Sequence, residues 1–199
     1  MKNKISSIEK LEQLAKKAKS KNKKIVLCHG VFDLLHIGHI KHFQEAKSYG
    51  DILIVTITPS EYVNKGPLRP AFNDKLRLEA LASLEIVDYV GVNYAPTATK
   101  IISKIKPNIY CKGPDYKNNK KDITGEIKNE IKAVKKIGSK IVYTKAISFS
   151  SSNLINKYLN LNNNNHQSLI NKVKKKYNYL KIKTLIESLK KLKVLVVGA

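Results

Sequence analysis

Cysteine is scarce in this chain of 199 residues, which has only Cys28 and Cys111. The two stand far apart, without a CxxC spacing and without a close set of histidine partners. Zinc sites and disulfide frameworks normally show such local spacing, so the cysteines predict neither. Their low number fits a protein kept in a reducing cytosol.

Arginine is scarcer still, because only Arg69 and Arg77 are arginines among 38 basic residues. With 15 acidic residues the net charge is +23, which can indicate nucleic acid or an anionic membrane as partner. Proteins that bind nucleic acid, however, usually use arginine forks and aromatic platforms. The lysines here are spread along helical patterns beside many Asn and Ile, as a biased composition would produce. We expect no nucleic-acid and no membrane partner, and keep a basic binding protein on an inactive scaffold as the alternative.

Long apolar runs are also absent, and none approaches the roughly 20 residues that cross a bilayer. The first 24 residues are polar, lysine-rich and helical in pattern, unlike a signal peptide. The hydrophobic fraction of 42% suffices for a buried core. The length suits one domain of roughly 150 residues with an appendage. We therefore expect a soluble, cytoplasmic protein.

Apolar strand patterns alternate with helical patterns through the first 159 residues. Residues 6–20 predict an amphipathic lead helix. Strands are predicted at 24–28, 51–58, 89–92, 108–111 and 140–143, and helices at 38–49, 74–84 (with Asp74 as N-cap), 97–105, 122–137 and 150–159. This alternation predicts an α/β fold, a Rossmann-like parallel sheet of about five strands flanked by helices.

The composition changes after residue 159. Residues 160–167 are low-complexity and predict a linker, and a lysine-rich helical pattern follows at about 168–191. An apolar strand pattern then ends the chain. We expect a lead helix at 1–21, the main domain at 22–159, a linker and basic helix at 160–192, and the first strand of a truncated further domain at 193–199. An extra edge strand of the main sheet is the alternative for that last segment.

The most informative stretch is HGVFDLLHIGH at 29–39, which follows the first predicted strand and opens a helix. A strand, a glycine turn and a helix N-terminus form an anion site, because free N–H groups and the helix dipole point at its occupant. His36 and His39 add side-chain donors there, which indicates a pocket for a nucleoside triphosphate. Their spacing would also suit zinc, but no third ligand with matching spacing is evident, so we assign no metal ligand.

The longer phrase Gly30-x-Phe32-Asp33-x-x-His36-x-Gly38-His39 resembles the signature of the cytidylyltransferase-like nucleotidyltransferases. The resemblance covers roughly residues 22–159. It implies that a substrate phosphate attacks the α-phosphorus of a nucleoside triphosphate and releases pyrophosphate. It also implies that Mg²⁺ accompanies the nucleotide with few protein ligands. The residues it assigns are His36 and His39 for catalysis, and Gly30, Val31, Phe32, Asp33 and Gly38 for nucleotide binding.

The segment NKGPLRP at 64–70 resembles the substrate-side loop of this family. The resemblance makes Lys65 the candidate catalytic and substrate-binding cation, with a solvated loop lysine as the alternative. Arg77 matches the family's helix arginine near the substrate. A surface ion pair of Arg77 with Asp74 or Glu79 is the alternative there.

Two more segments resemble the family's nucleotide contacts. KGPDY at 112–116 resembles the turn beside the nucleotide, and 149–155 resembles the segment whose hydroxyls face the β- and γ-phosphates. The residues assigned by this likeness are Lys112, Gly113, Asp115, Tyr116, Phe149, Ser150, Ser151 and Ser152. Lys145 stands where many relatives carry an arginine, and it lacks the bidentate fork. Since these segments all follow predicted strands, we expect them to converge at one edge of the sheet.

Within the family, GPxRPxFN, KGxDY and FSSSxLI look closest to the adenylyltransferase module of bifunctional heptose-phosphate kinase/adenylyltransferases. The terminal LKVLVVG resembles the opening strand of a PfkB-type sugar kinase domain, although the order of the two modules is then reversed. The resemblance implies transfer of AMP from ATP to a heptose 1-phosphate, a fused C-terminal kinase domain and, by analogy, a homodimer. CTP with glycerol 3-phosphate or another polyol phosphate is the alternative, while the loops weigh against a non-sugar acceptor.

Overall fold

A five-stranded parallel sheet lies at the centre of the computed structural model, which describes residues 4–65, 69–117, 126–145, 172–173 and 175–189. The strands are β1 (Ile25–Gly30), β2 (Ile52–Ile57), β3 (Tyr89–Val92), β4 (Ile109–Lys112) and β5 (Lys140–Tyr143). Their order is β3-β2-β1-β4-β5, and every pairing is parallel. Continuous apolar runs suit strands buried on both faces. The predicted α/β fold is confirmed.

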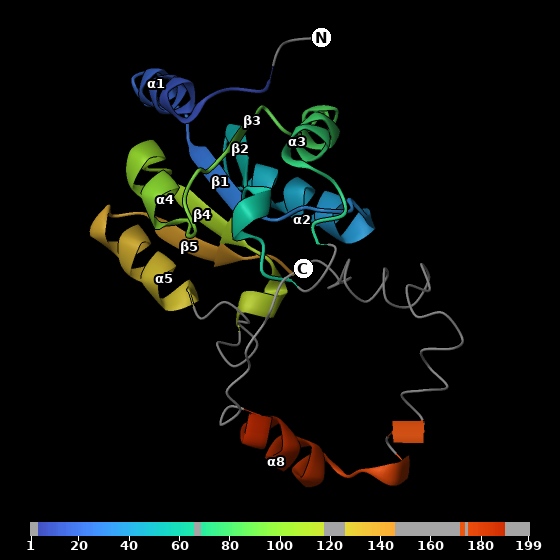
Figure 1. Cartoon of the computed structure of the whole chain (residues 1–199). Coiled ribbons are helices and arrows are strands. Elements are labelled where there is room, and N and C mark those ends of the chain that lie inside the picture. Colours follow the sequence, from blue (N-terminus) through green and yellow to red (C-terminus); the bar gives the residue numbers. More distant parts are fainter. Residues whose placement is uncertain (1–3, 66–68, 118–125, 146–171, 174, 190–199) are drawn as a thin grey trace, which may run out of the picture. The chain divides into compact units, whose positions relative to one another are not determined.

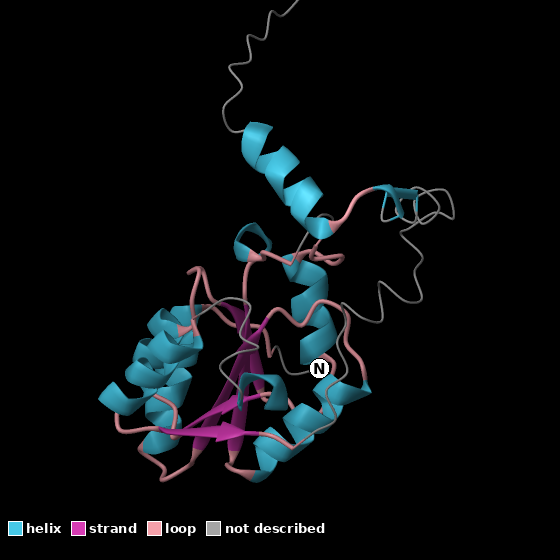
Figure 2. Cartoon of the chain, turned by 90° about the horizontal axis from the view of Figure 1, so that it is seen from below, coloured by secondary structure: helices cyan, strands magenta, loops and turns pink. Residues whose placement is uncertain are grey.

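Helices cover both faces of this sheet (Figure 1). On one face pack α2 (Ile37–Ser48) and α3 (Asp74–Ala82), and on the other α1 (Ile8–Lys19), α4 (Thr99–Ile105) and α5 (Ile127–Lys136). Figure 2 shows the strands between these two helical layers. Two short 3-10 helices, η1 (Ser60–Tyr62) and η2 (Pro114–Lys117), follow β2 and β4.

The sheet separates two apolar cores because successive strand residues point to opposite faces. In β1, Val26 and Cys28 face α2 and α3, while Ile25 and Leu27 face α1 and α4, and all four are fully buried. In β4, Cys111 belongs to the first core and its neighbour belongs to the second. Both cysteines therefore lie beneath α2.

The segment before α1 covers the outer edge of β3. Ser6 N donates to Val90 O at 2.9 Å, and Val90 N donates to Lys4 O at 2.9 Å. At Gly91, an added Cβ would lie 2.7 Å from Ser6 O, so glycine permits this close approach. The contact shields an edge that could otherwise pair with another chain. The predicted lead helix is confirmed as α1.

The start of α3 differs from the prediction. Asn73, rather than Asp74, is the N-cap, and its side chain accepts from Leu76 N at 3.0 Å. Asp74 is the first helical residue and accepts hydrogen bonds from Ser60 and Arg77 instead. The helix ends at Ala82, two residues before the predicted end. An Asn-Asp pair offers two possible caps, and the tertiary contact of Asp74 decides between them.

The chain forms two compact units, Met1–Ser151 and Ser152–Ala199. In the second unit the described part includes α8 (Tyr179–Leu189), which lies within the helical pattern predicted at 168–191. The helix predicted at 150–159, the linker at 160–167 and the strand at 193–199 lie outside the described residues. Among the described helices, none is both long and apolar enough to cross a membrane.

Candidate active site

Several of the predicted site segments lie together at the carboxyl ends of neighbouring strands. β1 leads into the histidine turn, β2 into the loop at 58–73, and β4 into η2. β1 pairs with β2 on one side and with β4 on the other, so the strand order reverses beside β1. Ligands of open α/β sheets bind in the crevice at such a point. The structure thus brings 29–39 and 112–116 together.

Phe32 shapes the turn between β1 and α2. Its φ of +47° is unusual for a bulky residue, and its ring is buried. The ring lies against Gly30, where an added Cβ would be only 3.1 Å away, so any larger residue there would press on the Phe32 ring. Phe32 also packs edge-on against His39, with ring centroids 5.4 Å apart, and against Phe43 at 5.1 Å. Gly30 and Phe32 therefore hold the turn in place around His39.

His36 and His39 form a stacked pair at the N-terminus of α2. Their ring centroids are 3.9 Å apart and the planes differ by 24°. His36 is the N-cap, and its Nδ1 accepts from the N–H of buried Gly38 at 3.1 Å. In the neutral ring the hydrogen is then carried by Nε2. Two imidazole donors and the positive end of the helix dipole meet here, which favours an anion.

Burial keeps both imidazoles neutral near pH 7. Desolvation lowers the pKa of His36. Desolvation, followed by repulsion from His36, His42 and Lys65, lowers the pKa of His39 to about 3, while the Leu34 backbone opposes this shift. In the free protein the pair therefore acts through N–H donors rather than as cations. A bound anion would favour the protonated rings and raise both pKa values.

Asp33 connects the histidine turn to the loop after β2. Its Oδ1 accepts from Phe72 N at 3.0 Å and its Oδ2 from Ala71 N at 2.9 Å. Arg69 Nε lies 2.8 Å from Oδ2 in an ion pair, and both side chains are buried. The nucleotide-binding role predicted for Asp33 stays a prediction, because its observed contacts are all with this loop. Its carboxylate positions the loop on the turn.

The loop after β2 carries two cations towards the histidines. Nη2 of Arg69 is buried and makes no hydrogen bond with the residues that the structure describes. Lys65 is exposed overall, yet partial desolvation and then repulsion from Arg69 lower its pKa, against an opposing effect of Asp33. Its charge also acts on His39. The sequence analysis assigned no role to Arg69. The scarcity of arginine in the chain was the one signal that could have indicated its importance.

Arg77 is buried to 0% exposure and uses all five of its N–H donors within the protein. These are Nε to Phe72 O (3.1 Å), Nη1 to Val31 O (2.7 Å) and Thr58 O (2.9 Å), and Nη2 to Ser60 Oγ (3.2 Å) and Asp74 Oδ1 (2.7 Å). The alternative for Arg77 was an ion pair on the surface of the helix. The ion pair with Asp74 exists, but Arg77 is buried and does not lie on the surface. The substrate contact stays a prediction, with no donor of Arg77 left over for it.

Lys112 is also buried, and α5 compensates its charge. Its Nζ lies 3.0 Å from Glu130 Oε2 and 4.0 Å from the centre of the Tyr116 ring. The sequence analysis did not identify Glu130, because its only visible feature was a position in a helical pattern. Beside Lys112, a Cβ added at Gly113 would meet nothing within 4 Å, and Asp115 is exposed. Among the predicted nucleotide contacts of this turn, Gly113 therefore has room beside it and Asp115 is exposed, as far as the described residues show.

The predicted contacts Phe149, Ser150, Ser151 and Ser152 lie outside the described residues. Lys145, the last residue of the described range 126–145, has an exposed side chain. Its backbone N–H donates to both carboxylate oxygens of Glu45 in α2, at 3.1 and 2.9 Å. The chain after β5 is thus attached to the helix that carries the histidines.

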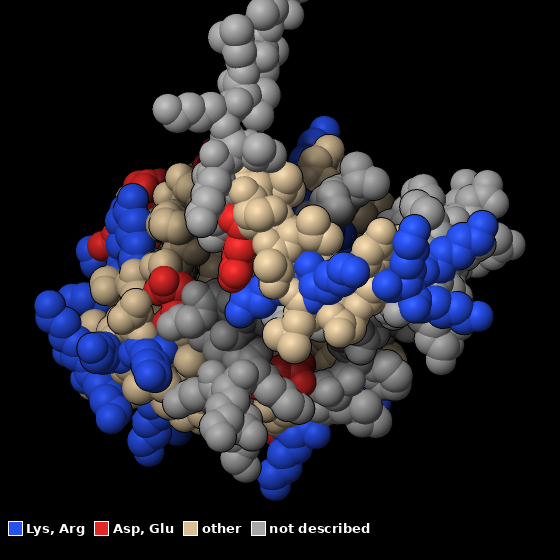
Figure 3. All heavy atoms as spheres, turned by 60° about the horizontal axis from the view of Figure 1, so that its bottom comes forward, with Lys and Arg blue, Asp and Glu red and all other residues tan. Residues whose placement is uncertain are grey.

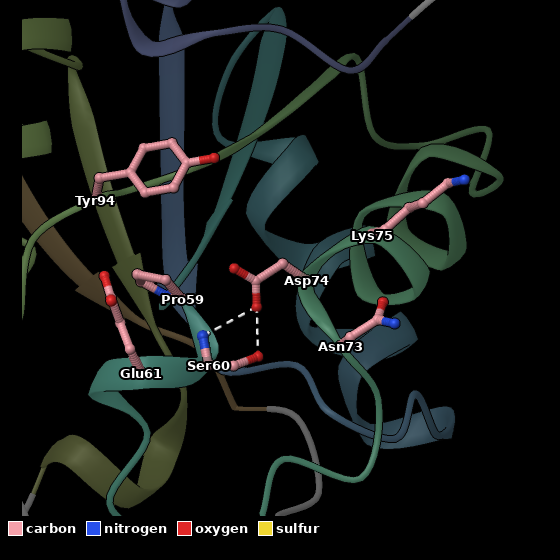
Figure 4. Close-up of a pocket in the computed structure, with 7 residues that line it drawn as sticks. All are labelled: Pro59, Ser60, Glu61, Asn73, Asp74, Lys75 and Tyr94. Carbon is pink, nitrogen blue, oxygen red and sulfur yellow. Dashed lines mark hydrogen bonds between the residues drawn. The ribbon is translucent and has the colours of Figure 1, made fainter.

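A pocket of about 450 Å³ opens beside this site, near the carboxyl ends of β2 and β3 (Figure 4). It is lined by Pro59, Ser60, Glu61, Asn73, Asp74, Lys75 and Tyr94. Ser60 donates to Asp74 from both its N–H and its hydroxyl, and Tyr94 stands across from Asn73 and Lys75. Several polar groups beside one aromatic ring suit a small polar ligand.

Comparison with known proteins identifies the family. The family model described as Cytidylyltransferase-like matches residues 27–158. The chain belongs to the cytidylyltransferase-like family. The matched range of this cytidylyltransferase-like chain begins inside β1 and includes the histidine turn, the loop after β2, η2 and β5. The resemblance stated from the motifs is confirmed.

Two curated proteins similar to this cytidylyltransferase-like chain are both called Bifunctional protein HldE. The protein of Aliarcobacter butzleri is 43% identical over 139 residues, which cover 68% of this chain and 29% of that protein. The protein of Helicobacter pylori strain Shi470 is 44% identical over 117 residues, covering 58% and 25%. The chain thus spans less than a third of the length of these relatives.

Solved structures of the same fold include a lipopolysaccharide core biosynthesis protein from Thermoplasma volcanium. It has a TM-score of 0.53 and 26% identity, over 63% of this cytidylyltransferase-like chain and 99% of that chain. A pantoate-beta-alanine ligase from Francisella tularensis has a TM-score of 0.51 and 19% identity, over 84% and 85% of the two chains. The second likeness concerns the fold alone.

The lysines of this cytidylyltransferase-like chain bear on the alternative of a basic binding protein. On the face shown in Figure 3, Lys and Arg atoms form separate groups with acidic and uncharged atoms between them. A protein that binds nucleic acid through lysines needs a continuous basic patch or stripe. The visible face gives that alternative no support, and the absence of a nucleic-acid partner stays a prediction.

Proposed function

We propose that this chain is a nucleotidyltransferase that joins AMP from ATP to a heptose 1-phosphate and releases pyrophosphate. The observation that carries the proposal is the stacked pair of His36 and His39 at the N-terminus of α2, beside β1 and β4. In the loop after β2, Lys65 acts electrostatically on His39, and Arg69 pairs with Asp33 of the histidine turn. The likeness to proteins called HldE supports the heptose class of acceptor.

The chemistry needs position and positive charge more than covalent help. A phosphate oxygen of the acceptor attacks the α-phosphorus of ATP in line. A new P–O bond forms while the bond from the α-phosphorus to the oxygen shared with the β-phosphorus breaks, and pyrophosphate leaves. The attacking oxygen is already an anion, so no general base is required. His36 and His39 donate to the phosphate oxygens, and Lys65 and Arg69 stabilise the charge that develops.

Mg²⁺ enters this proposal as part of the nucleotide substrate. Asp33, the carboxylate of the histidine turn, is engaged by Arg69 and two backbone N–H groups. Among the described residues, no cluster of three carboxylates gathers near the turn. This donor set fits an ion held by triphosphate oxygens and water, as Mg²⁺ prefers, rather than by a protein cage. The ion would screen the charge of the triphosphate.

The acceptor sugar, we propose, occupies the pocket of Figure 4. Lys75 and Asn73 offer donors, Glu61 offers an acceptor for hydroxyl groups, and Tyr94 offers an aromatic face. The pocket borders the loop that carries Lys65 and Arg69. Arg77 joins the wall of this pocket to the histidine turn. A sugar bound there would have its phosphate near the triphosphate.

The resemblance also motivates three further proposals for the whole protein. They are a cytoplasmic location, a homodimer, and a kinase domain fused after this chain. The fused domain is supported by relatives more than three times as long as the region they share with this chain. The segment 193–199, on which the kinase expectation depends, lies outside the described residues.

Pyrophosphate release tests the proposed activity. The purified chain is incubated with ATP or CTP and a panel of heptose, hexose and polyol phosphates, and the nucleotide product is identified by mass spectrometry. We expect the fastest turnover with ATP and a heptose 1-phosphate. Preference for CTP and a polyol phosphate would replace this substrate assignment with the cytidylyltransferase alternative. Absence of turnover with every pair would contradict the transferase proposal.

Nucleotide binding is predicted to take up protons. In the free protein the pKa of His39 is about 3, so the ring is unprotonated between pH 5 and 8. A bound triphosphate raises this pKa. At any pH between the pKa of the free protein and the pKa of the complex, the complex then holds more protons than the free protein. Affinity for ATP should therefore rise as the pH falls from 8 towards 6, with a limiting slope of about tenfold per pH unit per ring.

Titration calorimetry in buffers of different ionisation enthalpy measures this uptake directly. The matched control is His39→Asn, which keeps a polar side chain and cannot accept a proton in this range. We expect the proton uptake to decrease in this variant. Equal uptake in the wild type and in His39→Asn would show that His39 takes up no proton when the triphosphate binds.

A further inference from the structure

Two cysteines and a histidine meet in the core beneath the histidine turn. Cys28 of β1 and Cys111 of β4 are register partners on neighbouring strands. His42 of α2 joins them, and the possible ligand atoms of the three residues all lie within 4.8 Å of one another. The residues are 0%, 1% and 8% exposed. The nucleotidyltransferase mechanism uses none of the three.

We propose that Cys28, Cys111 and His42 bind one thiophilic divalent metal ion, with zinc as the best fit. Zinc takes thiolates at about 2.3 Å and imidazole at about 2.0 Å in tetrahedral geometry. Those bond lengths place ligand atoms about 3.5–3.8 Å apart, so movements of about 1 Å or less close the site. Two thiolates and an imidazole suit zinc, whereas Mg²⁺ requires oxygen ligands.

The hydrogen bond of His42 suits a metal ligand. Its Nδ1 lies 2.9 Å from the hydroxyl of buried Thr144. A donor bond from Nδ1–H to this hydroxyl leaves the Nε2 lone pair available to a metal, as in most histidine sites. Thr144 thus acts as a positioning residue for the proposed ligand.

The charge balance also favours a divalent ion. On binding, two S–H bonds break, two metal–sulfur bonds and one metal–nitrogen bond form, and two protons leave to solvent. Two thiolates and a divalent ion make a neutral unit, which an apolar core tolerates far better than a single charge. The nearby cation Lys112 is already paired with Glu130.

Such an ion would join β1, β4 and α2. These three elements carry Gly30, Lys112 and the histidine pair, so the metal would stabilise the framework of the nucleotide site without contacting the nucleotide. The proposal does not depend on the proposed transferase function. A chain without transferase activity could still bind the metal, and an active chain could lack it.

Metal alone is the probe in the experiment. The whole chain is stripped with a chelator, kept reduced with a phosphine, and titrated with Co²⁺ and then Zn²⁺. We expect one equivalent of Co²⁺ with thiolate-to-cobalt charge-transfer absorption, displacement by Zn²⁺, and a higher Tm. Release of close to two protons per metal at pH 7 is expected as well.

Variants test the assignment residue by residue. Cys28→Ala, Cys111→Ala and His42→Gln should each weaken or abolish the cobalt spectrum. Thr144→Val keeps all three ligands and should lower the affinity by about 10–100-fold. The matched control is His29→Gln, a buried histidine of β1 whose ring nitrogens contact Thr56 and Thr58 at 3.0 and 3.2 Å. It should keep one equivalent of metal, and circular dichroism shows which variants fold.

Two outcomes would overturn the proposal. One is binding without charge-transfer absorption, or binding that persists in the folded cysteine variants, because either places the metal elsewhere on the chain. The other is the absence of stoichiometric binding at about 10 µM metal and protein. If every ligand variant fails to fold, Thr144→Val and the proton release of the wild type still decide.

Discussion

Replacing His36 or His39 by alanine is expected to lower kcat for pyrophosphate release by about 10²–10³-fold, the usual effect of removing one preorganised donor. Each ring offers an N–H to the phosphates at the N-terminus of α2, and both rings are partly buried. Steady-state kinetics with saturating ATP and acceptor measure the effect. The KM for ATP should change less than kcat, because the donors matter most where charge develops.

The N-cap role of His36 must be separated from catalysis. His36→Ala removes the acceptor for Gly38 N–H and should cost about 1 kcal/mol of stability. His36→Asn keeps a capping acceptor but not the Nε2 donor, so it should lose activity and keep stability. Gln44→Ala, at an exposed position of α2, serves as the control for the helix. Near-normal kcat in folded His36→Asn or His39→Ala would show that the assigned role is wrong.

The two rings should not act independently. Their centroids are 3.9 Å apart, and the charge of one lowers the pKa of the other. Residues in contact couple, and catalytic groups that act as a unit give effects far from additive. The double variant should therefore lose less activity than the product of the two single losses.

The fold was predictable because most residues of β1 to β4 are buried and apolar. Tyr89–Val92 forms a strand with the predicted bounds, and Ile52–Ile57 lies within the predicted apolar run. A continuous apolar run between two helical patterns is typical of a buried strand in a parallel sheet and fits few other structures. The segment 4–6 along β3 was missed, since a single bridge at Ile5 leaves no periodic pattern. The cap of α3 was misplaced by one residue for a tertiary reason, the contact of Asp74 with Ser60.

The candidate site was predictable where the chemistry is local. The histidine turn lies within eleven consecutive residues, and its anion-binding character follows from a strand, a glycine and a helix start. The contacts of Asp33 and Arg77 were not predictable, because their partners lie 38 and 46 residues away in the chain. Charged residues are rarely buried unless paired, so a surface position was the natural expectation for Arg77.

The same limit applies to Cys28, His42 and Cys111. Spacing rules for metal sites depend on ligands that are close in sequence. Here the ligands come from two strands and a helix, and the parallel pairing of β1 with β4 places the cysteines opposite each other. The sequence offered no signal for this juxtaposition except the strand order itself.

Replacing Arg77 by alanine is expected to lower the free energy of unfolding by about 3 kcal/mol, the upper part of the usual range for single substitutions, because it removes a fully buried side chain from a hydrogen-bond network. The change leaves the carbonyl groups of Val31, Thr58 and Phe72 without their donor in partly buried hydrogen bonds. A domain is typically stable by 5–15 kcal/mol, so this loss removes a large part of the total. Urea denaturation followed by circular dichroism measures it. Lys75→Ala, an exposed position of the same helix, should have little effect.

Arg77→Lys distinguishes a structural role from a substrate contact. Lysine keeps the charge but has three donors on one nitrogen, so it cannot reproduce five bonds in three directions. If Arg77 holds the loops together, Arg77→Lys should lose stability in the absence of any substrate, and ATP and acceptor should restore only what binding contributes. If Arg77 contacts substrate, Arg77→Lys should keep its urea midpoint and show a raised KM. The five bonds within the protein favour the first result, since a guanidinium without a remaining donor has nothing to offer a phosphate.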